Sequence, residues 1–440
     1  MIHDQEQPVI IGSGLSGMMI SEMLSRDRIH HVLIGDAPNT LPRLGESLNL
    51  DGTLGLWELF PEFSQYYIPK KYAVSYLGDY VFVCTFARGR LILPRLFFTL
   101  LGYKTPLNGL VQFDRLGFDA ALYNQVISSP YCQQMSEKVV DIAYDPPSDT
   151  LKKITFSNGD FLTPSYVFDA TNHGRLVGQA AGIHCTMIGD PQRVVYTHYH
   201  AQEDAAAPLE AWEYSTNIIL LSPERDTIHG LAWCIPLGNY VSIGVNIKAS
   251  DSNLSDEALL EIAEQAYARR GLHYRQRYRL PTTTMSLKYH FFIHERAYGG
   301  NWLLVGPAYC QIWWMSGAGV GTSFAAAQIA ASVLQNPQKF GRLYQDYLRG
   351  LLNLHRIFDW FISTDYSLVT VKDVAGQGDH LVTSNLRRIA RSTRLRPRKI
   401  SQLFGFLFSR ILTLKGYCYA IKVEPAQQTE SIFKRAVEKR

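Results

Sequence analysis

The chain has 440 residues, 46% of them hydrophobic and 19% charged, which excludes a disordered polar chain and allows a large buried core. The formal net charge of +4 is too small for this length to indicate nucleic-acid binding. The sequence contains no run of about 18 apolar residues that would predict a membrane span. The first eight residues predict no signal peptide, and the six cysteines form no Cys-x-x-Cys pair. We therefore expect a reduced cytoplasmic protein without a metal site.

A nucleotide-binding pattern begins close to the N-terminus. Residues 8–11 predict a buried parallel strand, residues 12–17 read Gly-Ser-Gly-Leu-Ser-Gly, and residues 18–24 predict a helix. In such a turn the first glycine permits the bend, the second lets a pyrophosphate approach, and the third lets the helix pack closely. The next predicted strand ends at Asp36, where a carboxylate can meet a ribose hydroxyl. The residues predicted to bind a dinucleotide are Gly12, Ser13, Gly14, Gly17 and Asp36.

Three later segments identify the type of dinucleotide. Residues 112–119 contain Phe-Asp-Arg-Leu-Gly-Phe-Asp, residues 169–174 read Asp-Ala-Thr-Asn-His-Gly, and residues 302–308 read Trp-Leu-Leu-Val-Gly-Pro-Ala. These segments resemble the flavoprotein monooxygenase and halogenase superfamily. The resemblance implies FAD as cofactor, with Arg115, Asp169 and Gly306 at the cofactor site. The superfamily carries an aspartate where this chain has Pro307, and proline supplies neither a carboxylate nor an N–H group.

Four stretches resemble more specifically the flavin-dependent halogenases that act on phenols, pyrroles or carrier-linked substrates. The first, Pro-Arg-Leu-Gly-Glu-Ser-Leu at residues 42–48, matches a family segment that isoprenoid-chain reductases share. This match implies that Arg43 and Ser47 bind the cofactor. The alternative reading of the stretch is a loop closed by an ion pair between Arg43 and Glu46.

The second stretch contains two consecutive lysines. Residues 67–73 read Tyr-Ile-Pro-Lys-Lys-Tyr-Ala and resemble the family's "F-x-x-K-x-G" segment, whose lysine meets hypohalous acid. By position we assign this role to Lys71, and a strand would direct Lys70 to the other face. A pair of solvated lysines at the start of a strand is the alternative.

The third stretch, residues 230–237, reads Gly-Leu-Ala-Trp-Cys-Ile-Pro-Leu and resembles the family's "G-W-x-W-x-I-P-L". It implies that Trp233 and Pro236 line the substrate pocket, while Leu231 replaces the first family tryptophan. The fourth, residues 313–320, aligns with the flavin-capping loop and implies halide binding at Ala318 and Gly319. There Trp313 and Trp314 replace Asp-Pro and are assigned to the pocket, and Ser316 stands where tryptophan halogenases carry glutamate.

The rest of the chain predicts strands at residues 194–199, 218–222 and 230–247, and a helix at 256–269 capped by Ser255. Residues 317–319 would open a helix over 322–334, and residues 340–361 also predict a helix.

His198 and His200 lie at strand spacing, for which a pocket-lining role is favoured over metal binding. Arginines concentrate at residues 387–399. This region would be a helical cover, a docking surface for an acidic carrier protein or a membrane-surface helix.

We therefore predict an α/β fold: a Rossmann-like FAD-binding domain, a substrate-binding sheet domain and a C-terminal helical region. The expected FAD-binding domain comprises residues 1–60, 105–185 and 295–340. The substrate-binding domain comprises 61–104 and 186–294, and the helical region 341–440. These boundaries follow the placement of the motifs along the chain.

The leading functional hypothesis is an FAD-dependent halogenase that uses reduced FAD, O2 and chloride or bromide to halogenate an electron-rich, possibly carrier-bound, substrate. Because the chain has no second dinucleotide motif, a separate flavin reductase would supply reduced FAD. A flavin-dependent hydroxylase or isoprenoid-type reductase is the first alternative. A flavin-binding protein without turnover is the second.

Overall fold

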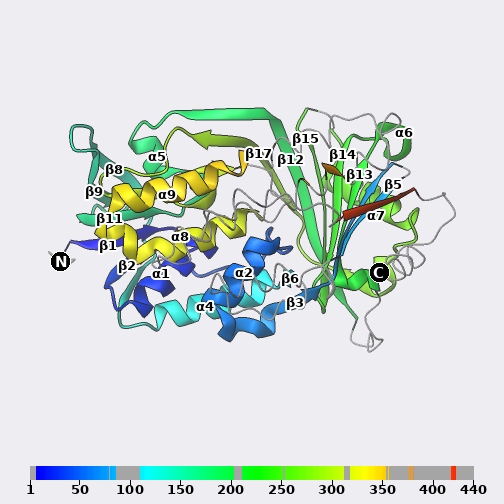
Figure 1. The fold of residues 1–440 in the computed structure, drawn as a ribbon, viewed down its shortest axis with the longest axis horizontal. Coiled ribbons are helices and arrows are strands. Elements are labelled where there is room, and N and C mark those ends of the chain that lie inside the picture. Colours follow the sequence, from blue (N-terminus) through cyan, green and yellow to red (C-terminus); the bar gives the residue numbers. More distant parts are fainter. Residues whose placement is uncertain are drawn as a thin grey trace.

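The computed structural model describes residues 6–78, 80–85, 110–202, 211–250, 253–311, 318–352, 355, 376–377, 380 and 418–422. Two large sheets lie side by side and are joined by two long strands, β12 (Cys185–Ala201) and β17 (Met285–His294), which extend from one half of the molecule into the other (Figure 1). Trp313, Trp314 and the arginines at 387–399 lie outside the described residues.

The first sheet has five parallel strands and contains the N-terminal motif. Its strands, in spatial order, are β18 (Trp302–Leu304), β11 (Pro164–Asp169), β1 (Gln7–Ile11), β2 (His31–Ile34) and β7 (Cys132–Met135). The inner strands β11, β1 and β2 are mostly apolar and buried, as expected for a parallel sheet that helices cover, whereas the edge strand β7 is more polar. The Rossmann-like fold predicted from the sequence is confirmed.

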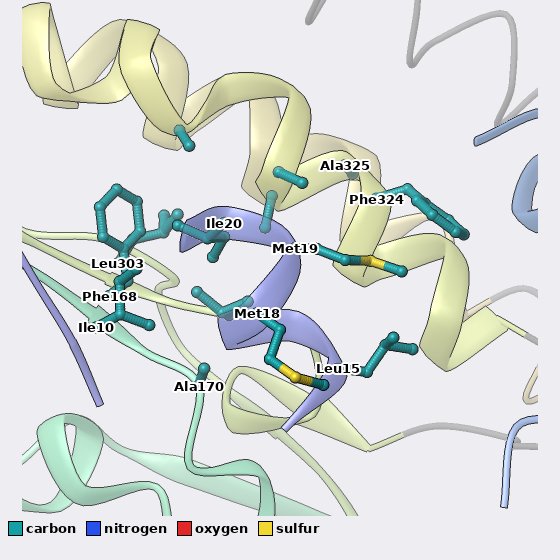
Figure 2. Packing of buried hydrophobic residues seen from close by; sticks show 14 of the residues in the cluster. Ile10, Leu15, Met18, Met19, Ile20, Phe168, Ala170, Leu303, Phe324 and Ala325 are labelled. Carbon is teal, nitrogen blue, oxygen red and sulfur yellow. The ribbon is translucent and has the colours of Figure 1, made fainter. Parts of the chain in front are cut away.

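Helices from distant parts of the chain pack around this sheet. They are α1 (Leu15–Arg26), α2 (Leu50–Leu59), α4 (Arg115–Ile127), α8 (Ala318–Gln335) and α9 (Pro337–Arg349). Helix α1 packs against α4 and α8, and α8 packs against α2 and α9. Met18, Met19 and Ile20 of α1 lie between the strands and the alanine-rich α8 (Figure 2). Small side chains on α8 allow this close packing.

The second sheet has ten strands. Their spatial order is β19 (Cys310–Gln311), β17, β12, β15 (Tyr240–Lys248), β14 (Gly230–Pro236), β13 (Ser215–Leu221), β4 (Tyr72–Leu77), β5 (Tyr80–Thr85) and β20 (Cys418–Lys422), with β16 (Tyr278–Pro281) also paired to β12. The three strand regions predicted at 194–247 are confirmed. The predicted helical region beyond residue 340 contains α9 but also β20, which pairs with β5.

The two faces of the large sheet bury different side chains. One face packs against α7 (Asp256–Ala268), whose N-cap Ser255 accepts a hydrogen bond from the Ala258 amide as predicted. The other face carries a separate apolar cluster that includes Tyr196, Trp233 and Tyr240 and contacts Leu44. Because strand residues alternate, Tyr199 of β12 lies on the α7 face while Tyr196 lies on the opposite one.

Short elements complete the fold. A three-stranded antiparallel sheet contains β8 (Val139–Asp145), β9 (Thr150–Phe156) and β10 (Phe161–Leu162). Strand β3 (Tyr67–Lys70) pairs with β6 (Leu110–Phe113). The short helices are α5 (Leu176–Ala180), α6 (Pro223–Asp226), η1 (Pro61–Tyr66), η2 (Asn172–Gly174), η3 (Ala211–Tyr214), η4 (Tyr274–Gln276) and η5 (Gly306–Ala308). Among the described residues, no helix is long and apolar enough to cross a membrane.

Candidate functional site

The glycine turn after β1 shows the geometry that a pyrophosphate site requires. Gly12 has φ +109°, and a Cβ there would lie 2.6 Å from the Ala170 carbonyl oxygen. A Cβ on Gly17 would lie 1.8 Å from the Gly12 carbonyl oxygen, so this glycine lets α1 begin directly against the turn. Ser13 Oγ donates to the Asp36 carbonyl oxygen at 2.5 Å and ties the turn to the end of β2. The turn is therefore rigid and closely packed from behind.

The front of the same turn is open. Gly14 is exposed, it is the N-cap of α1, and a Cβ there would meet no atom within 4 Å. Having no side chain, Gly14 leaves the first amide groups of α1 facing outward, with the positive end of the helix dipole. The exposed Asp36 stands beside them at the end of β2. These residues fit the pyrophosphate and ribose of FAD.

The turn at Gly306 differs from the family pattern. Gly306 adopts φ +53° and donates its N–H to Tyr344 Oη of α9 at 2.7 Å, while the Ala308 and Tyr309 amides bond to Val305 and Gly306 carbonyls within the turn. Pro307 supplies no N–H. Every backbone donor of residues 306–309 is therefore used inside the protein or missing, and this turn has no backbone donor to offer a cofactor.

Tyr344 is expected to hold this turn in place. Its side chain is fully buried, and its hydroxyl contacts both Gly306 N and the Thr322 carbonyl oxygen of α8. Tyr344→Phe leaves the Gly306 amide without its partner, so we expect a loss of about 1–3 kcal/mol in unfolding free energy. Urea denaturation measures it. Tyr347→Phe, which removes a buried hydroxyl bonded to Asp51, is the matched control. If Tyr344→Phe has the same unfolding free energy as the wild type, Tyr344 does not hold the turn.

Arg115 and Arg43 share one carboxylate. Arg115 donates from Nε and Nη2 to the two oxygens of Asp119 at 3.0 and 2.8 Å and from Nη1 to the Leu44 carbonyl oxygen, and Arg43 Nη1 donates to Asp119 at 2.7 Å. Asp119 is fully buried. The Arg43–Glu46 ion pair weighed from the sequence is not formed, since Glu46 instead lies 2.8 Å from His198 Nε2. Both predicted cofactor arginines therefore brace the segment at residues 42–48, called here the 42–48 loop.

Asp169 is the last residue of β11 in the parallel sheet. It is fully buried, Oδ1 accepts from the Thr171 amide and hydroxyl, and Oδ2 accepts from the Val177 amide. Burial raises the pKa of the Asp169 carboxyl, and these hydrogen bonds oppose the rise. The structure thus gives Asp169 an indirect part: it fixes the loop at 170–177 beside Gly12.

The two consecutive lysines lie in very different surroundings. Lys71 is exposed, with Nζ 3.8 Å from the centre of the Tyr214 ring. Lys70 is 5% exposed, and its Nζ donates to Ser47 Oγ at 2.8 Å and to the Leu48 carbonyl oxygen at 3.1 Å. The aromatic-x-x-Lys spacing, counted from Tyr67, reaches Lys70. Successive side chains of β3 point to opposite faces of the strand, and that of Lys70 lies on the buried side.

Burial lowers the pKa of Lys70 from 10.5 to about 7. Between those two pH values the unfolded chain binds a proton that the folded protein does not, so stability rises with pH. We expect the unfolding free energy to increase by about 1.4 kcal/mol per pH unit between pH 7.5 and 9.5 from this group. Denaturant titrations of wild type and Lys70→Met measure it, and equal slopes would contradict a buried neutral amine.

Ser47 joins the 42–48 loop to the large sheet. Its Oγ lies 2.6 Å from Thr216 Oγ1 of β13 and accepts the hydrogen bond from Lys70. The sequence predicted Ser47 as a cofactor ligand, and the structure gives it this bridging position. A Cβ on Gly45 in the same loop would come within 3.2 Å of Val320 on α8. The 42–48 loop is therefore the place where α8, β3 and the large sheet meet.

The sheet face beside this loop is apolar and aromatic. Trp233 is 1% exposed and donates Nε1 to Ser242 Oγ at 3.3 Å, and Pro236 is buried at the end of β14. Leu231 packs into the same cluster. The His198 and Tyr240 rings lie 4.7 Å apart, and Tyr240 donates to Asp114 at 2.9 Å. The described residues include no cluster of three or more potential metal ligands.

The predicted halide residues stand at the start of α8. Gly319 is exposed, and a Cβ there would meet nothing within 4 Å. Its carbonyl oxygen accepts from Thr322 Oγ1 at 2.6 Å, which stabilises the first turn. Ala318 is the first residue of α8. The helix therefore begins before the predicted start at Thr322.

Comparison with solved structures shows the same arrangement elsewhere. PltM, a halogenase solved with FAD, superposes with a TM-score of 0.68 at 16% identity over 99% of this chain and 91% of PltM. The flavin-dependent brominase Bmp2, as a triple mutant, gives 0.63 at 16% identity over 92% and 99%. The chain has the fold of the flavin-dependent halogenases. BrvH, a halogenase from Brevundimonas sp. BAL3, gives 0.58 at 12% identity over 98% of both chains.

A flavoprotein/dehydrogenase from Cytophaga hutchinsonii shares the fold too, with a TM-score of 0.64 at 14% identity over 91% and 99%. No family model matches the sequence, and no curated protein matches it either. The similarity is therefore seen in the three-dimensional structure. In this structure the five-stranded parallel sheet and the ten-stranded sheet meet at the 42–48 loop.

Proposed function

We propose that the protein is an FAD-dependent halogenase that acts on an electron-rich aromatic or pyrrolic substrate. The observation that carries this proposal is Lys70: a buried amine at the 42–48 loop, on a fold shared with PltM, Bmp2 and BrvH. A buried lysine is costly to maintain, and one at the junction of two sheets is a candidate for chemistry. We assign the halogen-handling role to Lys70 and withdraw it from Lys71.

The α1 amides at Gly14, together with Asp36, would hold the pyrophosphate and ribose of FAD, and Gly319 at the start of α8 would stand at the halide end. Reduced FAD held there would supply two electrons to O2, which with halide and a proton would give oxidised FAD, water and hypohalous acid. Arg43 and Arg115 would act indirectly, since both are bound to Asp119 and so fix the 42–48 loop.

Lys70 would hold the oxidised halogen. Its pKa of about 7 means that both the charged and the neutral amine are populated at neutral pH, so Nζ can donate or accept a hydrogen bond. The hydrogen bonds to Ser47 and Leu48 fix the position of Nζ, and its burial keeps water from competing. The residue would thus orient a small reactive species toward the substrate.

The substrate pocket would be formed along the sheet face that carries Trp233 and Pro236. Large aromatic side chains there favour a flat, apolar substrate. One PltM structure holds phloroglucinol with FAD, and an electron-rich phenol is accordingly our first choice of substrate. A separate flavin reductase would be the partner protein. The substrate would alternatively be bound to a carrier protein, and the proposed location is the cytoplasm.

The test supplies the purified protein with FAD, a flavin reductase, NADH, oxygen, bromide and an electron-rich phenol such as phloroglucinol. Mass spectrometry then looks for the two-isotope pattern of bromine in the product. Brominated phenol that requires both bromide and the protein supports the proposal. Leu231 stands where the halogenases have a tryptophan, so this sheet face has one indole fewer. This difference favours a hydroxylase as the alternative. A product heavier by one oxygen, with no bromine, would therefore overturn halogenation in favour of hydroxylation.

A further inference from the structure

A cavity of about 320 Å³ lies on the α7 side of the large sheet, across the sheet from Trp233. It is lined by the second half of α7, the short helix η4 and the start of β16. The volume falls within the range of small-molecule sites, about 300–1,000 Å³. None of the predicted cofactor or substrate residues lines it, so the cavity is separate from the proposed halogenation site.

The cavity carries an excess of positive charge. Two arginines, Arg275 and the exposed Arg279, line it against one carboxylate, Glu264, and the exposed His273 adds ring nitrogens that can form hydrogen bonds. Arg275 is already engaged: it lies 3.3 Å from Glu264, and its guanidinium carbon is 4.5 Å from the centre of the Tyr199 ring. Within the described ranges, Arg279 has no carboxylate partner; it donates only to the Gln276 carbonyl oxygen, at 3.3 Å. The positive charge of Arg279 is thus available to a ligand.

Apart from Gln276, the rest of the lining is apolar or aromatic. Ala268 of α7 and the buried Leu272 form one part, and the buried Tyr274 forms another, with its ring 5.7 Å from that of Tyr199. The Tyr199 and Tyr274 rings, tilted by 50° against each other, and Arg275 over Tyr199 give this region a fixed shape. A site with an apolar body and a cationic end complements a ligand of the same two-part character.

We propose that this cavity binds a small organic anion, a carboxylate carried on an aromatic body. The carboxylate would meet Arg279 and His273, and the aromatic part would lie against Leu272 and Tyr274. Such a site adds a second ligand to the protein, beyond the proposed halogenation. The cavity residues Tyr274 and Arg275 contact Tyr199 of β12, and the next residue back, His198, lies 2.8 Å from Glu46 of the 42–48 loop.

The test uses 4-fluorobenzoate as the probe and follows its ¹⁹F NMR line width with the wild-type full-length chain. We expect concentration-dependent broadening by the wild type, and a roughly tenfold weaker affinity in Arg279→Ala, because a charge-assisted contact is lost. Arg225→Ala, which removes an exposed arginine of α6, should retain wild-type affinity. The neutral 4-fluorobenzamide should broaden far less than the carboxylate.

Two results would overturn the proposal. One is the absence of broadening with the wild type at millimolar probe. The other is equal affinity in Arg279→Ala and wild type, which would place the probe elsewhere. Neither result bears on halogenation, which is measured by the brominated product.

Discussion

Lys70→Met is expected to abolish halogenation while leaving FAD binding intact. The variant removes the buried Nζ that bonds to Ser47 and Leu48 and replaces it by an apolar side chain of similar length. Its stability should not fall much, because an amine that burial penalises is removed along with its hydrogen bonds. Brominated product should drop at least about a hundredfold, in line with the loss of one positioned catalytic group.

Lys71→Met is the matched control, since it removes the adjacent amine, which is exposed and lies over Tyr214. It should brominate at close to the wild-type rate. Both variants should still bind FAD, which is followed by the quenching of flavin fluorescence. The reverse pattern, with activity kept in Lys70→Met and lost in Lys71→Met, would restore the original assignment of Lys71.

Gly17→Ala is expected to destabilise the FAD-binding half of the protein severely and to remove FAD binding. Its Cβ would lie 1.8 Å from the Gly12 carbonyl oxygen, and backbone on both sides of the contact cannot yield without shifting α1 away from β1. Overpacking against rigid backbone costs about 3 kcal/mol or more. The unfolding free energy from urea denaturation and the FAD dissociation constant measure the two effects.

Gly14→Ala separates folding from binding at the same turn. A Cβ there meets no protein atom within 4 Å, so the variant should fold with nearly wild-type stability. It should nevertheless weaken FAD binding, because the methyl group enters the space where the pyrophosphate would approach the α1 amides. Unchanged FAD affinity in Gly14→Ala would show that the cofactor does not bind at this turn.

Local pattern was sufficient to predict the FAD-binding half. The turn at residues 12–17, the strand ending at Asp36 and the Asp169 segment are each short, and their geometry follows from glycine and from apolar strand residues. The strands of the large sheet at residues 194–199, 218–222 and 230–247 were also predictable, because apolar and aromatic runs bounded by turns require no distant partner to be recognised.

Side-chain partners at the junction could not be predicted in this way. The sequence assigned Lys71, weighed an Arg43–Glu46 pair and made Asp169 a cofactor residue. The structure buries Lys70, pairs Arg43 with Asp119, brings Glu46 to His198 and encloses Asp169 under its own loop. The outcomes at Lys70, Arg43 and Glu46 depend on contacts between residues far apart in the sequence, whereas Asp169 bonds within its own loop. A shift of one residue along a strand also reverses which side chain is buried.

The sequence by itself determined that the chain has a Rossmann-like parallel sheet with a glycine turn after its first strand, and a second sheet beside it, because those features rest on backbone geometry and local apolar pattern. Only the tertiary structure decided which lysine is buried, which acid each arginine contacts, and that Tyr344 of α9 takes the Gly306 amide. The physical reason is that burial and charge pairing are set where β3, α8, α9 and the large sheet converge. That convergence exists only in three dimensions.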